Sequence, residues 1–136
     1  MADFRRVTDD FTTAPQIALS DVAEAARLGY RTIINNRPDG EEPGQPTSAE
    51  VEAAARAAGL AYHHLPVRGG PTADQVEETL GVLAAAETPV LAFCRSGTRS
   101  IVTWSLCQAT SGARSRDSLI ALGRDAGYDL SGVLGA

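Results

Sequence analysis

The sequence predicts one α/β domain over residues 1–136, built on a parallel sheet of four to five strands with helices on both faces. The first observation is that short apolar runs alternate with longer segments of helical periodicity, an order typical of such sheets. The second is that the helical segments carry their own start and stop signals. The third is composition: 136 residues, 43% hydrophobic and 21% charged, can bury one core and exclude a disordered chain.

Three strands are predicted from the apolar runs. Residues 31–35 are β-branched at their centre and lead into a polar loop at 36–46. Residues 60–67 form the second run, and residues 89–93 form the third, which is apolar throughout, as expected of a strand buried on both faces. A further strand or hairpin is expected between residues 4 and 19.

Five helices are predicted between and after these runs. Thr47 and Thr72 both begin capping boxes, because a glutamate or glutamine follows three residues later. Ser20 and Ser115 are expected to cap two further helices, since each precedes a segment that a glycine closes. The predicted segments are 20–29, 47–59, 72–84, 100–109 and 115–126.

The predicted topology brings three loops together. In a parallel sheet, ligands bind beyond the carboxyl ends of the strands. The loops that begin at Asn36, Arg68 and Cys94 each follow a predicted strand. We therefore expect all three loops on one rim of the sheet, with the Cys94 loop after a central strand.

The loop at 94–100, CRSGTRS, carries the clearest chemistry. A buried strand ends at a cysteine, and four residues later an arginine opens a helix. Such a turn directs successive backbone N–H groups into one concavity that binds anions, and the helix N-terminus adds partial positive charge. The same field favours thiolate at Cys94, and the Ser100 hydroxyl could donate to that sulfur. The predicted catalytic pair is Cys94 and Arg99, and the predicted anion-binding residues are Arg95, Ser96, Gly97, Thr98 and Ser100.

Composition excludes several other functions. The net charge of −5 argues against general nucleic-acid binding, and no apolar run is long enough for a membrane span. All 12 basic residues are arginine. Two cysteines are too few for a disulfide framework or a cysteine-rich zinc site, so no metal or cofactor is expected and a cytoplasmic location is the default expectation. Cys107 lies about 12 Å along the helix from the loop, which disfavours a resolving cysteine.

The chain also resembles a known family. The stretches that carry the resemblance are YRTIINNRPDGEEP at 30–43, AGLAYHHLPVRGGP at 58–71 and PVLAFCRSGTRS at 89–100, with a weak match in the tail at 127–132. Together they are similar to the phosphatase-like domain of beta-lactamase-hydrolase-like proteins, a bacterial family often described as sulfurtransferases. The CRSGTRS loop resembles that of rhodanese-type sulfurtransferases and is one residue shorter than the loop of tyrosine and dual-specificity phosphatases. The resemblance implies a phosphatase-like sheet that carries a rhodanese-length loop.

Two observations favour sulfur transfer. Phosphate-ester cleavage needs an acid to protonate the leaving oxygen, yet residues 68–71, where the resemblance would place it, contain none. The four-residue spacing suits a single sulfane sulfur on the cysteine. The sequence therefore predicts a Cys94 persulfide that carries sulfur from a small anionic donor, such as thiosulfate or a low-molecular-weight persulfide, to a thiol or cyanide. The alternatives are a cysteine-dependent tyrosine or dual-specificity-like phosphatase and a non-enzymatic persulfide carrier or anion-binding module.

Several polar residues are expected on the rim. Arg37 is expected either to bind outer oxygens of the substrate or to order the Cys94 loop. Asp39, with the glutamates at 41–42, belongs either to a solvated turn or to the acid that a phosphatase would need. Arg68 and Gly69 complete the predicted rim, and the Arg68 and Arg95 side chains are expected to face solvent.

Overall fold

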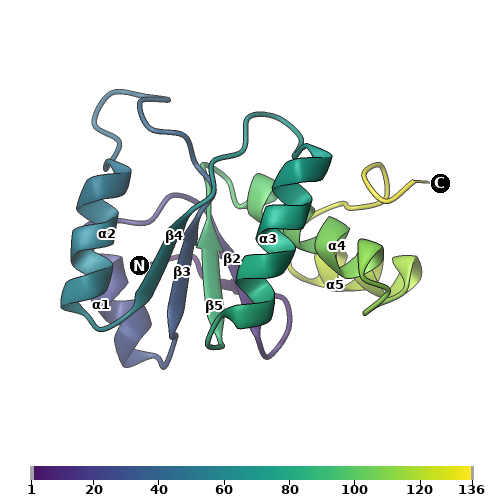
Figure 1. Ribbon diagram of the computed structural model, residues 1–136, viewed down its shortest axis with the longest axis horizontal. Helices are drawn as coiled ribbons and strands as arrows, with labels where there is room; N and C mark the ends of the chain where they lie inside the picture. Colours follow the sequence, from purple (N-terminus) through teal and green to yellow (C-terminus); the bar gives the residue numbers. More distant parts are fainter. Residues whose placement is uncertain (1, 136) are drawn as a thin grey trace.

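The computed structural model describes residues 2–135 as one mixed sheet between two layers of helices (Figure 1). The strand order in the sheet is β1-β2-β5-β3-β4, so β5 is central. All neighbouring pairs are parallel except β1 with β2, which is antiparallel. The strands are β1 (Arg5–Arg6), β2 (Phe11–Ala14), β3 (Thr32–Asn35), β4 (Ala61–His64) and β5 (Val90–Phe93).

Helices cover both faces of the sheet (Figure 1). The pair α1 and α2 packs on one face, and α3, α4 and α5 pack on the other. The helices are α1 (Leu19–Arg27), α2 (Ser48–Ala57), α3 (Ala73–Ala85), α4 (Thr98–Thr110) and α5 (Arg116–Asp125). None of them, within residues 2–135, has the length and apolar character that crossing a membrane requires.

The two layers bury separate apolar clusters, and the strand pleat divides residues between them. Successive side chains of a strand point to opposite faces. Accordingly Ile33 and Leu91 pack with α1 and α2, whereas Ile34 and Ala92 pack with the other three helices. Every residue of β5 is buried, which confirms the prediction of a strand covered on both faces.

The predicted strands and most helix starts are confirmed, and Thr47, Thr72 and Ser115 cap their helices as expected. The expected early hairpin is β1 and β2. The Ser20 cap was wrong: Ser20 lies inside the first turn of α1, and the cap position is Ala18, whose N–H donates to Asp21. The predicted helix at 100–109 begins earlier, at Thr98, because Gly97 serves as its cap residue.

Candidate active site

Cys94 follows the central strand β5 and directly precedes the loop that leads into α4. The residue is fully buried, and its Sγ accepts a hydrogen bond from the Gly97 N–H at 3.1 Å. Gly97 has φ +90°, a left-handed conformation that glycine adopts without strain. The turn therefore folds back on the cysteine and points a backbone donor at the sulfur.

The other amides of the loop are also turned away from protein carbonyls. Within residues 2–135, none of the N–H groups from Ser96 to Arg99 donates to a backbone carbonyl. The Thr98 N–H makes only a long contact, 3.4 Å, with the Ser96 hydroxyl. A helix N-terminus with unpaired amides favours an anion, so the loop can hold an oxyanion beside Cys94.

Arg99 comes from the first turn of α4 and is held by one edge. Its Nη1 and Nη2 donate to the two carboxylate oxygens of Glu41, both at 2.8 Å, and Nη1 also donates to the Val67 carbonyl at 2.9 Å. A guanidinium has five N–H donors. The remaining two, on Nε and the adjacent side of Nη2, form a second bidentate edge that no carboxylate or carbonyl among residues 2–135 occupies, and the nearby Cys94 sulfur contributes to the raised pKa of Arg99. Arg99 can thus grip two oxygens of a substrate while Glu41 fixes it from the other side.

Glu41 is ionised in this arrangement. The hydrogen bonds from Arg99, aided by those from Arg37, lower the pKa of the Glu41 carboxyl to about 2, although partial burial opposes the shift. In return, Glu41 raises the pKa of Arg99. A carboxylate with so low a pKa holds no proton near neutral pH, so it positions Arg99 and is a poor general acid.

Arg37 lies beneath Glu41 and is almost completely buried, with a side-chain exposure of 1%. It donates to Glu41 at 2.9 Å, to Gln16 at 3.0 Å and to Glu42 at 3.0 Å. The second role expected for Arg37 was to order the Cys94 loop; the contacts show instead that it orders the acidic loop, whose Glu41 in turn holds Arg99. Three of the five N–H donors of Arg37 are engaged by these side chains and the guanidinium is almost completely buried, so it does not reach toward a substrate.

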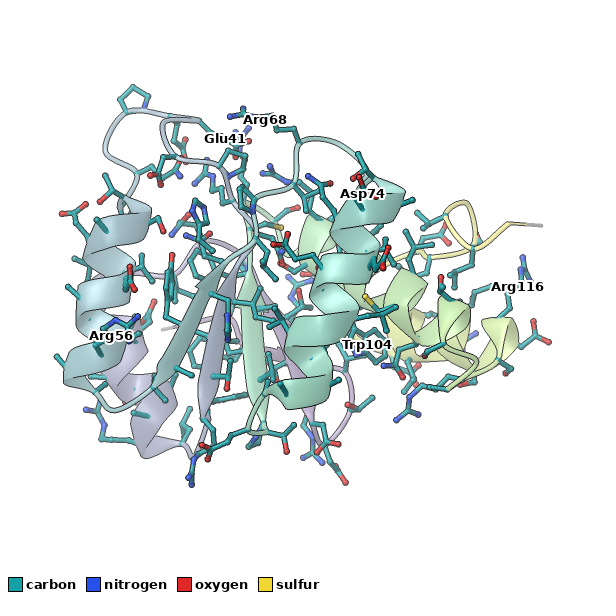
Figure 2. The ribbon with its side chains drawn as sticks, in the orientation of Figure 1. Glu41, Arg56, Arg68, Asp74, Trp104 and Arg116 are labelled. Carbon is teal, nitrogen blue, oxygen red and sulfur yellow. The ribbon has the colours of Figure 1, made fainter. Side chains whose placement is uncertain are left out.

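The three predicted rim loops meet at one end of the sheet, where Figure 2 shows Glu41 of the first loop and Arg68 of the second. Arg99, at the end of the third loop, bonds both Glu41 and Val67, the neighbour of Arg68. Asp39 accepts from the Ser48 N–H at 2.8 Å and so caps α2 instead of facing Cys94. Arg68 and Gly69 lie in an exposed turn and contribute through their neighbour Val67, whose carbonyl receives Arg99.

The remaining loop side chains differ in exposure. Arg95, Ser96 and Thr98 are exposed, and the Ser96 hydroxyl donates to Thr98 at 3.0 Å. The Ser100 hydroxyl is buried and has no hydrogen-bond partner among residues 2–135, so the expected bond to the Cys94 sulfur is not formed in this state.

Sequence reasoning missed the groups that support the loop from outside. Three successive loop carbonyls, those of residues 95, 96 and 97, each accept from a distant residue. The donors are the Gln16 N–H at 3.2 Å, the Tyr128 hydroxyl at 2.8 Å and the Thr13 hydroxyl at 2.8 Å. Only the tail resemblance at 127–132 pointed toward any of them. They come from both ends of the chain, so no local pattern could have linked them to Cys94.

Cys107 takes no part in this arrangement. Both cysteines are free, and the Cys107 thiol donates to the Val76 carbonyl at 3.5 Å. Burial raises the pKa of Cys107 to about 11, which keeps it a thiol and makes it a weak nucleophile.

Comparison with known proteins places the chain in a family. Residues 3–111 match the family described as beta-lactamase hydrolase-like protein, phosphatase-like domain. A beta-lactamase hydrolase-like protein of Xylella fastidiosa is 46% identical over 106 residues, which cover 77% of this chain. The chain spans only about a quarter of the length of that relative, because the match covers 25% of it.

Solved structures agree on the fold. The crystal structure of a candidate phosphatase from Neisseria meningitidis has a TM-score of 0.86 and 33% identity, over 98% of this chain and 95% of that one. TpbA of P. aeruginosa, at 18% identity, covers 98% of this chain and 75% of its own with a TM-score of 0.67, which shows a shared fold. With a phosphatase-like α/β fold and a sequence match across most of its length, the chain belongs to the family of phosphatase-like domains of beta-lactamase hydrolase-like proteins.

Proposed function

We propose that the chain is a cysteine-dependent phosphatase that hydrolyses phosphate monoesters of acidic alcohols, phenols above all. The observation that carries the proposal is the site at the end of β5: a buried sulfur that accepts a backbone N–H, beside a guanidinium edge that no protein oxygen within residues 2–135 occupies. The phosphatase-like fold adds support, and it raises this chemistry above the sulfur transfer that the loop length favoured.

In the first step, the Cys94 thiolate attacks phosphorus. The S–P bond forms as the bond from phosphorus to the ester oxygen breaks, and the departing oxygen takes a proton from water. The loop amides and the free edge of Arg99 stabilise the charge on the three other phosphoryl oxygens. In the second step, water attacks phosphorus, the S–P bond breaks, and inorganic phosphate leaves with the thiolate restored. The unpartnered Ser100 hydroxyl is available to donate to the sulfur as it departs.

The leaving group decides the substrate class. The carboxyl that contacts Arg99, that of Glu41, is ionised, so it does not supply a proton to the leaving oxygen. A phenol, with a pKa of about 10, leaves far more readily as an anion than an aliphatic alcohol does. TpbA, which shares the fold, has been crystallised with pTyr, an ester of this phenolic kind.

The test is a series of phosphate monoesters with leaving groups of decreasing acidity. We expect turnover to fall steeply along the series, with aryl esters cleaved on the order of 10²-fold faster than alkyl esters. Cys94→Ser should abolish turnover, and Cys107→Ser, the matched control, should leave it nearly unchanged. The proposal fails if aryl-phosphate turnover is absent or survives in Cys94→Ser.

Sulfur transfer remains a second candidate because of one specific observation. Only four residues separate Cys94 from Arg99, and sulfite or a thiolate can leave without an acid. The Cys94 thiolate would attack the sulfane sulfur of thiosulfate, release sulfite and form a persulfide. A second thiol or cyanide would then attack the outer sulfur, the S–S bond would break, and the Cys94 thiolate would be restored. Intact mass separates the two: a phosphoester should add one phosphoryl group to Cys94, whereas thiosulfate should add one sulfur atom. A stable persulfide without turnover would indicate the carrier alternative.

A further inference from the structure

The peptide between Ser96 and Gly97 has both of its polar groups engaged. Its carbonyl accepts from the Tyr128 hydroxyl at 2.8 Å, and its N–H donates to the Cys94 sulfur at 3.1 Å. In a trans peptide the C=O and the N–H point in opposite directions, because the group is planar and rigid. A donor that fixes the carbonyl on one side therefore also fixes the direction of the N–H on the other.

We propose that Tyr128 is a positioning residue for the nucleophile: its hydroxyl holds the Ser96 carbonyl and thereby aims the Gly97 N–H at the Cys94 sulfur. The inference rests on the proposed role of Cys94. Among residues 2–135 no other donor reaches the Ser96 carbonyl, so the orientation of this peptide depends on one hydroxyl.

The close approach of Tyr128 to the loop depends on Gly97. A Cβ on residue 97 would lie 2.2 Å from the Tyr128 hydroxyl oxygen and 3.2 Å from the backbone of Ala14. The hydroxyl thus occupies space that any other residue at 97 would fill. The ring is itself held, since Tyr128 is nine-tenths buried and the Arg5 guanidinium lies 5.2 Å from its centroid.

Tyr128 also keeps its proton. Burial raises the pKa of its phenol, with the charge of Cys94 acting in the same direction and Arg5 opposing. The hydroxyl therefore remains a donor over the pH range in which a thiol titrates. The charged and titratable groups around the sulfur are Arg99 from α4 and Tyr128 from the tail, with Glu41 behind Arg99.

The experiment follows the alkylation of Cys94 by iodoacetamide as a function of pH, read at the Cys94 peptide by mass spectrometry. Tyr128→Phe removes the hydroxyl and keeps the ring. We expect the midpoint of the profile to rise by about half to one pH unit, because the thiolate loses an aimed donor. We also expect protection by inorganic phosphate to weaken about fivefold. Tyr30→Phe is the matched control, since it removes a hydroxyl bonded to Thr12 at 2.7 Å, at the other end of the sheet.

A second variant keeps the test decisive. Tyr128→Leu removes ring and hydroxyl together, and both Tyr128 variants should shift the midpoint while circular dichroism reports a folded chain. An unchanged midpoint in Tyr128→Phe, or a shift in Tyr128→Leu alone, overturns the proposal, because packing of the ring would then be the cause. The outcome is independent of turnover: the shift can be present in a chain that cleaves no phosphoester, and absent in one that does.

Discussion

At the scale of single residues, Glu41 decides how Arg99 faces the site. It takes one edge of the guanidinium and leaves the other for an anion. We predict that Glu41→Gln lowers kcat/KM for an aryl phosphate about tenfold, because a charge-assisted bidentate contact of roughly 1.5–3 kcal/mol is weakened. Glu42→Gln is the control, since the Glu42 side chain bonds Arg37 and no other group among residues 2–135, and it is half exposed. Equal losses in the two variants would contradict the assignment.

The same carboxyl makes stability depend on pH. Its folded pKa, about 2, lies below the ordinary value of 4.5, so the unfolded chain binds more protons in acid. The stabilisation is fully present above the unfolded pKa and is lost as the pH falls toward about 2. We predict that, between about pH 5 and about pH 3, the free energy of unfolding falls less steeply with decreasing pH in Glu41→Gln than in the parent chain. Urea titrations at a series of pH values measure both slopes, and parallel slopes would refute the prediction.

Gly97 is the residue at which the loop tolerates least change. Alanine there would adopt a left-handed conformation and press a Cβ against the Tyr128 hydroxyl. We predict that Gly97→Ala destabilises the fold by about 2–4 kcal/mol, the sum of backbone strain and overpacking. Gly70→Ala is the control, because no atom lies within 4 Å of its added Cβ. Denaturant unfolding of both variants tests this, and a cost at Gly97 no larger than at Gly70 would rule it out.

At the scale of elements, the helix starts that are set by side-chain caps were predicted correctly from the sequence. Thr47 and Thr72 accept the N–H of the third residue of their helices, as their capping boxes indicated. The start of α1 was missed because its cap is a backbone N–H bonded to Asp21, with alanine at the cap position. The hairpin β1–β2 could not be placed because two-residue β1 has no periodicity to detect.

The acidic loop after β3 depends on Arg37, a charge that is buried among three partners. We predict that Arg37→Ala costs about 2–4 kcal/mol of unfolding free energy, because carboxylates that pair with a buried guanidinium lose it. The Arg37→Ala substitution should also lower activity, since Glu41, which positions Arg99, loses its hydrogen bond from Arg37. Arg56→Ala, which breaks an exposed pair with Glu52 on α2, should cost about 0.5 kcal/mol or less. Calorimetry of the two variants gives the comparison, and similar costs would show that the Arg37 network adds no stability.

At the scale of the whole molecule, we propose that residues 1–136 fold as one domain although the chain spans about a quarter of its Xylella relative. The two apolar clusters pack on opposite faces of the same five strands, so each layer of helices depends on strands that the other layer also covers. We predict a single cooperative unfolding transition, with fluorescence of Trp104, in the α3–α5 layer, and far-ultraviolet circular dichroism changing together. Separate transitions would show two independent units.

The sequence was sufficient for the reacting loop and insufficient for its surroundings. Cys94, Gly97 and Arg99 are close in the chain, so their geometry follows from one turn and one helix start. Glu41, Gln16 and Tyr128 reach the loop only through the tertiary fold. The loop length and the absence of an acid at 68–71 favoured sulfur transfer, and the phosphatase-like fold is what ranks phosphate chemistry first.

The long reach of the Tyr128 contact has a consequence for protein synthesis. On the ribosome Cys94 emerges 34 residues before Tyr128, which follows from their numbers, 128 and 94. Until the tail closes on the loop, the Ser96–Gly97 peptide has no fixed direction and the thiol has no aimed donor. A nascent chain would therefore expose a cysteine without the Gly97 donor, and the loop geometry around its sulfur would form only on completion of the fold.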